Sequence, residues 1–126
     1  MAATGGDILL VDDDPGLLRL LSIRLNAAGY DVRAVQSGEV ALEAVETQRP
    51  DLVITDTNMP GIDGFETCRQ IRDAGSKEAP KIIVTTGAID AVDAIKARKS
   101  GADDYCVKTS DAAQLMAAVK NLIGEA

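Results

Sequence analysis

Acidic side chains follow two apolar stretches of the chain. Asp12, Asp13 and Asp14 come directly after the run ILLV, and Asp56 follows the run LVIT. If both runs are neighbouring parallel strands, their C-terminal ends bring Asp12, Asp13 and Asp56 into one crevice. Clustered carboxylates repel one another unless a cation joins them. One aspartate after a strand is usually a turn former or helix cap, but the paired arrangement favours a functional site.

The residue types indicate phosphoryl chemistry. A phosphate could approach Asp12 and Asp13 only with a divalent metal between them, and Mg2+ accepts carboxylate, water and phosphate oxygens together. Asp56 could then be the nucleophile, since carboxylates form acyl phosphates. Lys108 and the Thr85 hydroxyl could hold the phosphoryl oxygens. A flavin or dinucleotide site is disfavoured, because it needs amide donors rather than carboxylates after the first strand.

Five apolar runs alternate with helical patterns along the chain. The runs cover residues 8–11, 31–35, 52–55, 81–85 and 104–107. Helices are predicted from Pro15, capped by Asp14, to Gly29; from Ser37 to before Pro50; from Gly64 to near Gly75; from Ala91 to Lys99; and from Ser110 through Ile123. This alternation predicts an α/β fold with a parallel sheet covered by helices on both faces.

Length and composition limit the function classes. The chain has 126 residues, which suits one domain, and a net charge of -7, which disfavours direct binding to nucleic acid or to an anionic membrane. Histidine is absent, so a phosphohistidine donor must be another protein. Two cysteines without metal spacing, and no signal peptide or membrane span in the sequence, predict a cytoplasmic protein.

Four motifs together resemble the receiver domain of bacterial two-component response regulators. They are Asp12-Asp13, Asp56-x-Asn58-Met59-Pro60-Gly61-x-Asp63-Gly64, Val84-Thr85 and Tyr105-x-Val107-Lys108. The resemblance implies a single receiver domain over residues 1–126, with its core at 6–123. It also implies a doubly wound, flavodoxin-like three-layer sandwich with strand order 2-1-3-4-5.

The resemblance assigns roles to the acidic residues. Asp56 would accept a phosphoryl group from a sensor histidine kinase, from a histidine phosphotransfer protein, or from a small phosphodonor. Mg2+, with Mn2+ as an alternative, would be held by Asp13, Asp56 and the main-chain carbonyl of Asn58, and Asp12 would act through water. The domain would not be an enzyme beyond its own phosphorylation and dephosphorylation.

The resemblance also implies a conformational switch. Thr85 would move toward the phosphoryl group, and the ring of Tyr105 would turn inward. The surface around the fourth helix, fifth strand and fifth helix would signal to an effector protein or a fused output domain. A homodimer formed on activation is an open alternative.

Two positions depart from the family pattern. The family normally has proline after the lysine, with a cis peptide bond, whereas Thr109 follows Lys108 here. A cis bond before a non-proline residue costs about 2.5–4 kcal/mol, so a trans bond or a strained one would alter the aim of Lys108. Ser110 and Asp111 can still cap and start the last helix. Thr86 replaces a usually small residue and could narrow access to the phosphoryl site.

Two other functions stay open on the sequence. A receiver-like domain could bind partners without useful phosphotransfer, as the changes at Thr86 and Thr109 would allow. A phosphatase with an aspartyl nucleophile is a weaker alternative, because such enzymes need a second carboxylate two residues after the nucleophile. That position is Asn58 here.

Overall fold

A computed structural model describes residues 6–74, 79–87, 91–108 and 112–124, which form one parallel sheet and five helices. The strands are β1 (Asp7–Val11), β2 (Asp31–Val35), β3 (Leu52–Asp56), β4 (Lys81–Thr86) and β5 (Asp104–Val107). The helices are α1 (Pro15–Ala27), α2 (Gly38–Thr47), α3 (Gly64–Ala74), α4 (Ala91–Lys99) and α5 (Ala113–Ile123). The sheet order β2-β1-β3-β4-β5 confirms the predicted flavodoxin-like topology.

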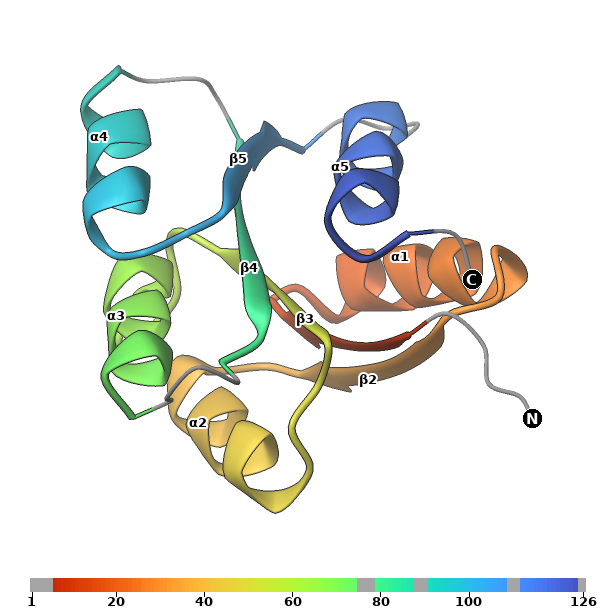
Figure 1. The fold of residues 1–126 in the computed structure, drawn as a ribbon, viewed down its shortest axis with the longest axis horizontal. Helices are drawn as coiled ribbons and strands as arrows, with labels where there is room; N and C mark the ends of the chain where they lie inside the picture. The colour runs from red at the N-terminus through yellow and green to blue at the C-terminus, as the bar shows by residue number, and fades with distance from the viewer. Residues whose placement is uncertain (1–5, 75–78, 88–90, 109–111, 125–126) are drawn as a thin grey trace.

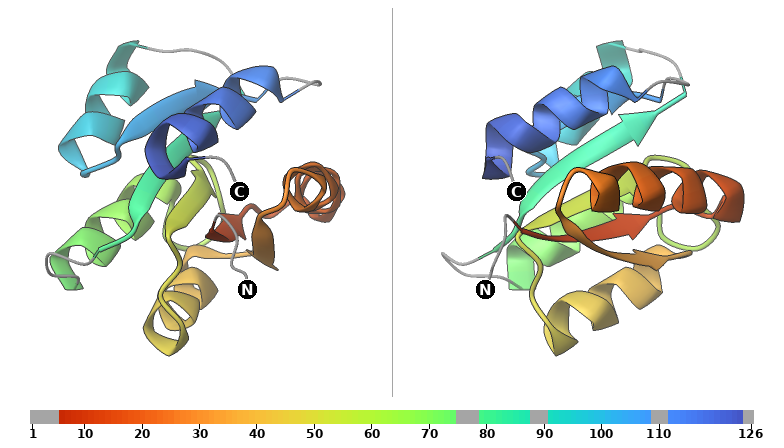
Figure 2. Two further views of the ribbon diagram at one scale, coloured as in Figure 1. Left: turned by 45° about the vertical axis from the view of Figure 1, so that its right-hand side comes forward. Right: turned by 90° about the vertical axis from the view of Figure 1, so that its right-hand side faces the viewer.

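The sheet is the middle of three layers. Helices α1 and α5 cover one face, and α2, α3 and α4 cover the other (Figure 1; Figure 2). Successive side chains of a strand point to opposite faces, so Ile8 and Leu10 pack with α1 and α5, whereas Leu9 and Val11 pack on the opposite side. Strands buried on both faces explain why the sequence shows continuous apolar runs instead of alternation.

Helix α1 follows its sequence signals closely. The carboxylate of Asp14 accepts hydrogen bonds from Gly16 N at 3.0 Å and Leu17 N at 3.3 Å, and Pro15 occupies the first turn, where it loses no hydrogen bond. The buried stripe consists of Leu18, Leu21 and Leu25. Beyond the helix, Gly29 has φ 101°, a conformation that suits glycine. The expected capping role of Asp14 is confirmed.

Helix α5 has an N-cap residue that provides no side-chain hydrogen bond. Its N-cap residue is Ala112, whose φ of 56° is left-handed, and the first helical residue is Ala113. Ser110 and Asp111, which were expected to cap and start this helix, lie outside the described residues. The stripe that packs on the sheet includes Leu115 and Val119, as the sequence predicted.

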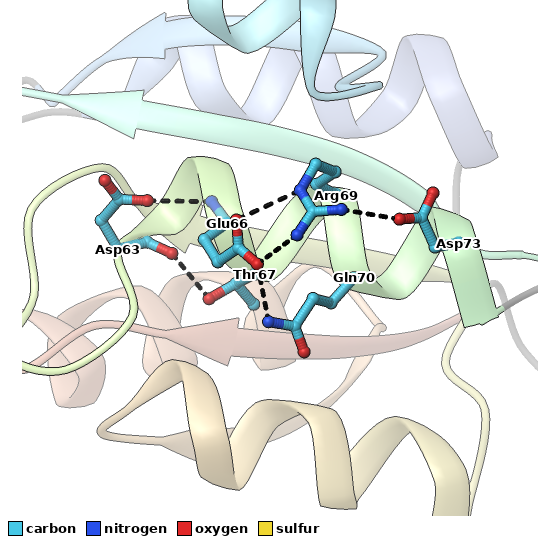
Figure 3. Close-up of polar contacts among 6 residues, drawn as sticks. All are labelled: Asp63, Glu66, Thr67, Arg69, Gln70 and Asp73. Carbon is cyan, nitrogen blue, oxygen red and sulfur yellow. Dashed lines mark hydrogen bonds and ion pairs between the residues drawn. The ribbon is translucent and has the colours of Figure 1, made fainter.

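The start of α3 is tied to the loop before it (Figure 3). Asp63 accepts hydrogen bonds from Glu66 N and from the hydroxyl of Thr67, both at 2.8 Å. Along the exposed side, Arg69 pairs with Glu66 and Asp73. Exposed pairs of this kind add little stability. The bonds to Asp63 thus join the first turn of α3 to the end of the β3–α3 loop, residues 57–63.

Candidate functional site

The acidic residues meet at the C-terminal edge of the sheet. Strands β1 and β3 are adjacent, with Val11 opposite Thr55, so the residues that follow these positions, Asp12 and Asp56, lie side by side. One carboxylate oxygen from each of Asp12, Asp13 and Asp56 lies within 4.8 Å of the others. Asp12 and Asp56 are buried, whereas Asp13 is exposed. The cluster is therefore an acidic pocket open to solvent on one side.

Lys108, the residue after β5, neutralises part of this charge. Its Nζ lies 3.0 Å from Asp12 Oδ2 and 3.0 Å from Asp56 Oδ1. Burial acts to lower the pKa of Lys108, but its hydrogen bonds to Asp12 and Asp56 outweigh burial and raise the pKa. The lysine therefore stays charged and bridges the two buried carboxylates.

The ionisation of Asp12 is opposed by its surroundings. Burial raises the pKa of Asp12, and the negative charge of Asp56 adds to this effect. The main-chain N–H of Asp14, which donates to Asp12 Oδ1 at 3.0 Å, and the ammonium of Lys108 act in the opposite direction and only partly compensate. A cation placed among the carboxylates would remove this penalty, so the donor set suits a hard divalent ion.

An open cavity of about 510 Å³ lies beside Asp56. Asn58 and Thr86, two residues that the sequence analysis singled out, border it. The sequence did not predict two further lining residues, Phe65 on α3 and Asp93 on α4. Both appear in the sequence as ordinary helix residues, and only the packing of their helices around the sheet brings them to this edge.

The proposed switch residues lie on neighbouring strands. Thr85 stands opposite Asp56 in the β3–β4 register, and its hydroxyl donates to the main-chain oxygen of Thr55 at 3.3 Å. Tyr105 is half-buried on β5 opposite Val84. Its hydroxyl is buried and has no hydrogen-bond partner among the residues that the structure describes. The Thr85 hydroxyl is thus turned toward the main chain of β3.

The two departures from the family pattern are placed differently by the structure. Thr86 is 5% exposed and borders the cavity, and its main-chain oxygen accepts a hydrogen bond from Lys108 N at 2.7 Å. Thr109 lies outside the described residues, and so does the cis or trans state of the peptide bond between it and Lys108. The position of the Lys108 side chain is nevertheless defined by its two ion pairs.

Residues 8–120 match the response regulator receiver domain as a family. The match covers most of the chain, and the fold and acidic pocket described above agree with it. The chain therefore belongs to the response regulator receiver domain family, as its motifs predicted. It is a signalling domain of two-component systems.

Curated relatives are longer proteins. Over 114 residues the chain is 41% identical to the DNA-binding response regulator MtrA of Mycolicibacterium smegmatis, covering 90% of this chain and 48% of MtrA. Over 101 residues it is 43% identical to the transcriptional regulatory protein AfsQ1 of Streptomyces coelicolor, covering 80% of this chain and 44% of AfsQ1. The chain spans about half the length of these relatives.

Solved structures share the whole fold. TrrA of Thermotoga maritima, in complex with Mg2+-BeF, superposes with a TM-score of 0.83 at 36% identity, covering 93% of this chain and 98% of TrrA. The chemotaxis protein CheY4 of Vibrio cholerae superposes with a TM-score of 0.88 at 26% identity, covering 95% of this chain and 100% of CheY4. Within the part of the chain described here, no helix has the length and apolar character needed to cross a membrane.

Proposed function

We propose that this receiver domain accepts a phosphoryl group on Asp56 and signals through Thr85 and Tyr105. The observation that carries the proposal is the meeting of the Asp12, Asp13 and Asp56 carboxylates within 4.8 Å. Lys108 lies 3.0 Å from two of these side chains. Clustered carboxylates beside a charged lysine suit a mechanism in which one carboxylate is the nucleophile and the others hold a metal.

Mg2+ is the proposed cofactor, and Mn2+ is an alternative with the same oxygen preference. Asp13, Asp56 and the main-chain carbonyl of Asn58 would bind the ion directly, and Asp12 would bind it through water. When bound, the ion would lower the negative charge that opposes the approach of a phosphoryl group. TrrA, whose structure is described as a complex with Mg2+-BeF, supports this choice by similarity.

The protein residues would supply positioning and charge. A carboxylate oxygen of Asp56 attacks phosphorus, an O–P bond forms, and the bond from phosphorus to the donor nitrogen or oxygen breaks. Lys108, already 3.0 Å from Asp56 Oδ1, stabilises the transferred oxygens. The Thr85 hydroxyl exchanges its hydrogen bond to Thr55 O for one to a phosphoryl oxygen. The ring of Tyr105 then turns inward, into the space that Thr85 leaves. Attack of water at the same site would return Asp56 to its free state.

The broader biology is also proposed. The domain would take its phosphoryl group from a sensor histidine kinase or a histidine phosphotransfer protein, in the cytoplasm, and act on an effector or a fused output domain. Residues 1–126 would form one receiver unit. The expectation that nucleic acid is not a direct partner concerns this unit alone, because MtrA, named as DNA-binding, is about twice as long as the matched region.

The two rival functions are less well supported. An interaction domain without phosphotransfer would not need the buried carboxylate of Asp12, whose burial penalty Lys108 and Asp14 N–H only partly offset. A phosphatase would need a second carboxylate two residues after Asp56, where the exposed Asn58 stands. Asp93 borders the cavity, but it lies on α4.

One experiment tests the proposal. The protein is incubated with acetyl phosphate and Mg2+, and its intact mass is compared with that of Asp56→Asn. We expect a mass increase of one phosphoryl group for the wild type, none for the variant, and none in EDTA. An unmodified wild type that binds Mg2+ would refute phosphotransfer. Continuous phosphate release from an organic phosphate ester would support the phosphatase. The chain has no tryptophan, so mass detection replaces fluorescence quenching.

A further inference from the structure

We infer that Glu39, in the first turn of α2, is a positioning residue for the metal site. It would hold the β3–α3 loop in the shape that presents the main-chain carbonyl of Asn58 to a divalent cation. This inference rests on the proposed function and adds a residue from outside the receiver motifs. In the described structure no hydrogen bond or ion pair joins Glu39 to the acidic cluster, so its positioning effect would pass through the loop.

The contact is a hydrogen bond between the Glu39 side chain and the loop backbone. Ile62 N–H donates to Glu39 Oε2 at 3.1 Å. Among the residues that the structure describes, this is the only hydrogen bond donated by a main-chain N–H of residues 58–63. The part of the loop formed by residues 58–63, called the crest below, therefore depends on α2 for its main-chain hydrogen bond. Glu39 and Ile62 are 23 residues apart in the sequence.

The base of the loop is held separately. Gly64 N donates to Thr57 O at 3.0 Å, and a side chain at Gly64 would collide with the main-chain oxygen of Asp56. Met59 is 6% exposed and packs in the core between the sheet and α2, α3 and α4. The base and Met59 thus fix where the loop begins and ends. Between them, in the described structure, the Glu39 carboxylate is the only hydrogen-bond acceptor for a main-chain N–H of residues 58–63.

Close packing leaves the crest little room to shift toward α2. Gly61 has φ 81°, and a Cβ there would lie 2.5 Å from Glu39 Oε2. Gly38 is buried, and a Cβ there would lie 2.6 Å from Ile62 Cγ1. Both glycines permit the first turn of α2 and the loop to touch directly. Loss of the Glu39 carboxylate would leave space at this contact and an unpaired N–H at Ile62.

Glu39 has a second effect that must be separated from this one. A carboxylate in the first turn of a helix stabilises it through the helix dipole, and any negative charge raises cation affinity slightly. Glu39→Gln removes the charge but keeps an oxygen that can accept from Ile62 N–H. Glu43→Ala removes an exposed carboxylate one turn later on the same helix and serves as the matched control.

The test combines three measurements on the wild type and on three variants, Glu39→Ala, Glu39→Gln and Glu43→Ala. They are amide hydrogen exchange at Ile62, Mg2+ affinity from chemical-shift titration, and the rate of phosphorylation by acetyl phosphate as a function of Mg2+ concentration. For Glu39→Ala we expect faster exchange at Ile62 and a loss of Mg2+ affinity of roughly three- to tenfold, as one hydrogen bond would give. At saturating Mg2+ its rate should return close to that of the wild type.

The controls decide the interpretation. Glu39→Gln and Glu43→Ala should keep Mg2+ affinity within about twofold of the wild type, because the bond to Ile62 is preserved. Unchanged exchange or unchanged affinity in Glu39→Ala would overturn the inference alone. An equal loss in Glu39→Gln would also overturn it, since charge would then be the cause. A wild type that binds no Mg2+ would instead refute the proposed function on which the inference rests.

Discussion

The two sides of the acidic pocket are held in different ways. On the β1–α1 side, acidic side chains bond to near neighbours in the sequence. Asp14 N–H donates to Asp12 Oδ1 at 3.0 Å, and the Asp14 carboxylate caps α1. On the β5–α5 side, the main-chain N–H of Lys108 donates to Thr86 O on β4 at 2.7 Å, and the N-cap residue of α5 provides no side-chain hydrogen bond. Both strand ends are bonded to a neighbouring strand, since Asp12 N–H also donates to Val35 O on β2 at 3.2 Å. The difference lies in the side chains: Asp12 and Asp14 are held by bonds between near neighbours in the sequence, whereas the Lys108 ammonium is held by tertiary contacts.

The end of β5 illustrates this dependence. Val107 N–H donates to Gln114 Oε1 on α5 at 3.1 Å, so the strand that delivers Lys108 is tied to the helix that follows it. On the β1–α1 side, the bonds that hold the Asp12 and Asp14 side chains join residues that are close in the sequence. The comparison suggests four tests, in which changes on the β5 side should cost stability and changes on the β1 side should separate metal binding from folding.

The largest effect on stability is expected for Lys108→Met. Without the ammonium group, Asp12 and Asp56 lose their shared partner, and the free energy of unfolding in EDTA should fall by about 2–3 kcal/mol, less than for a fully buried pair. Chemical unfolding followed by circular dichroism measures this change. Mg2+ should restore part of the loss by binding the folded state. Lys99→Met, at an exposed position on α4, is the control, and an equal loss there would contradict the prediction.

Asp13→Asn should weaken the metal site without harming the fold. We expect Mg2+ affinity to fall by about tenfold or more, since the change removes a direct ligand. The metal-free protein should become more stable, because one of three clustered negative charges is lost. Calorimetric titration and thermal unfolding measure the two effects. Asp31→Asn changes the same charge at the start of β2, and a similar loss of affinity in that variant would argue against a specific role for Asp13.

Asp14→Ala should lower the stability of the fold without weakening the metal site. Loss of the helix cap should lower the free energy of unfolding by about 1 kcal/mol, while Mg2+ affinity should stay nearly unchanged because only the Asp14 backbone contacts Asp12. Asp14→Asn keeps a capping oxygen and should recover most of the stability. If Asp14→Ala instead lost Mg2+ affinity as strongly as Asp13→Asn, the assignment of Asp14 as a cap would fail.

The smallest effect concerns the pH dependence of Asp12→Asn. Burial raises the pKa of Asp12 above its ordinary value of 3.8, so ionised Asp12 costs stability at neutral pH and protonated Asp12 does not. In EDTA the variant should therefore be more stable than the wild type at pH 7. The difference should shrink as the pH falls through the raised pKa and vanish below 3.8. A difference that grows toward acid pH would show that ionised Asp12 is net stabilising.

The sequence predicted much of the fold and site because the signals were local. The apolar runs gave five strands whose ends agree with the structure to within one residue, and Asp14 and Pro15 located the start of α1. The grouping of Asp12 with Asp56 followed from strand adjacency, which the motif order implied. The contribution of Glu39 was not predicted, since a glutamate in a first helical turn normally serves the helix dipole.

By itself the sequence determined the strands, the start of α1 and the identity of the acidic residues, because each depends on hydrophobic pattern and on contacts between near neighbours. Only the tertiary structure decided that Lys108 bridges Asp12 and Asp56, that Thr85 turns toward Thr55, and that Glu39 reaches Ile62. These contacts join segments far apart in the chain, and their geometry is set by how strands and helices pack, which no local pattern encodes.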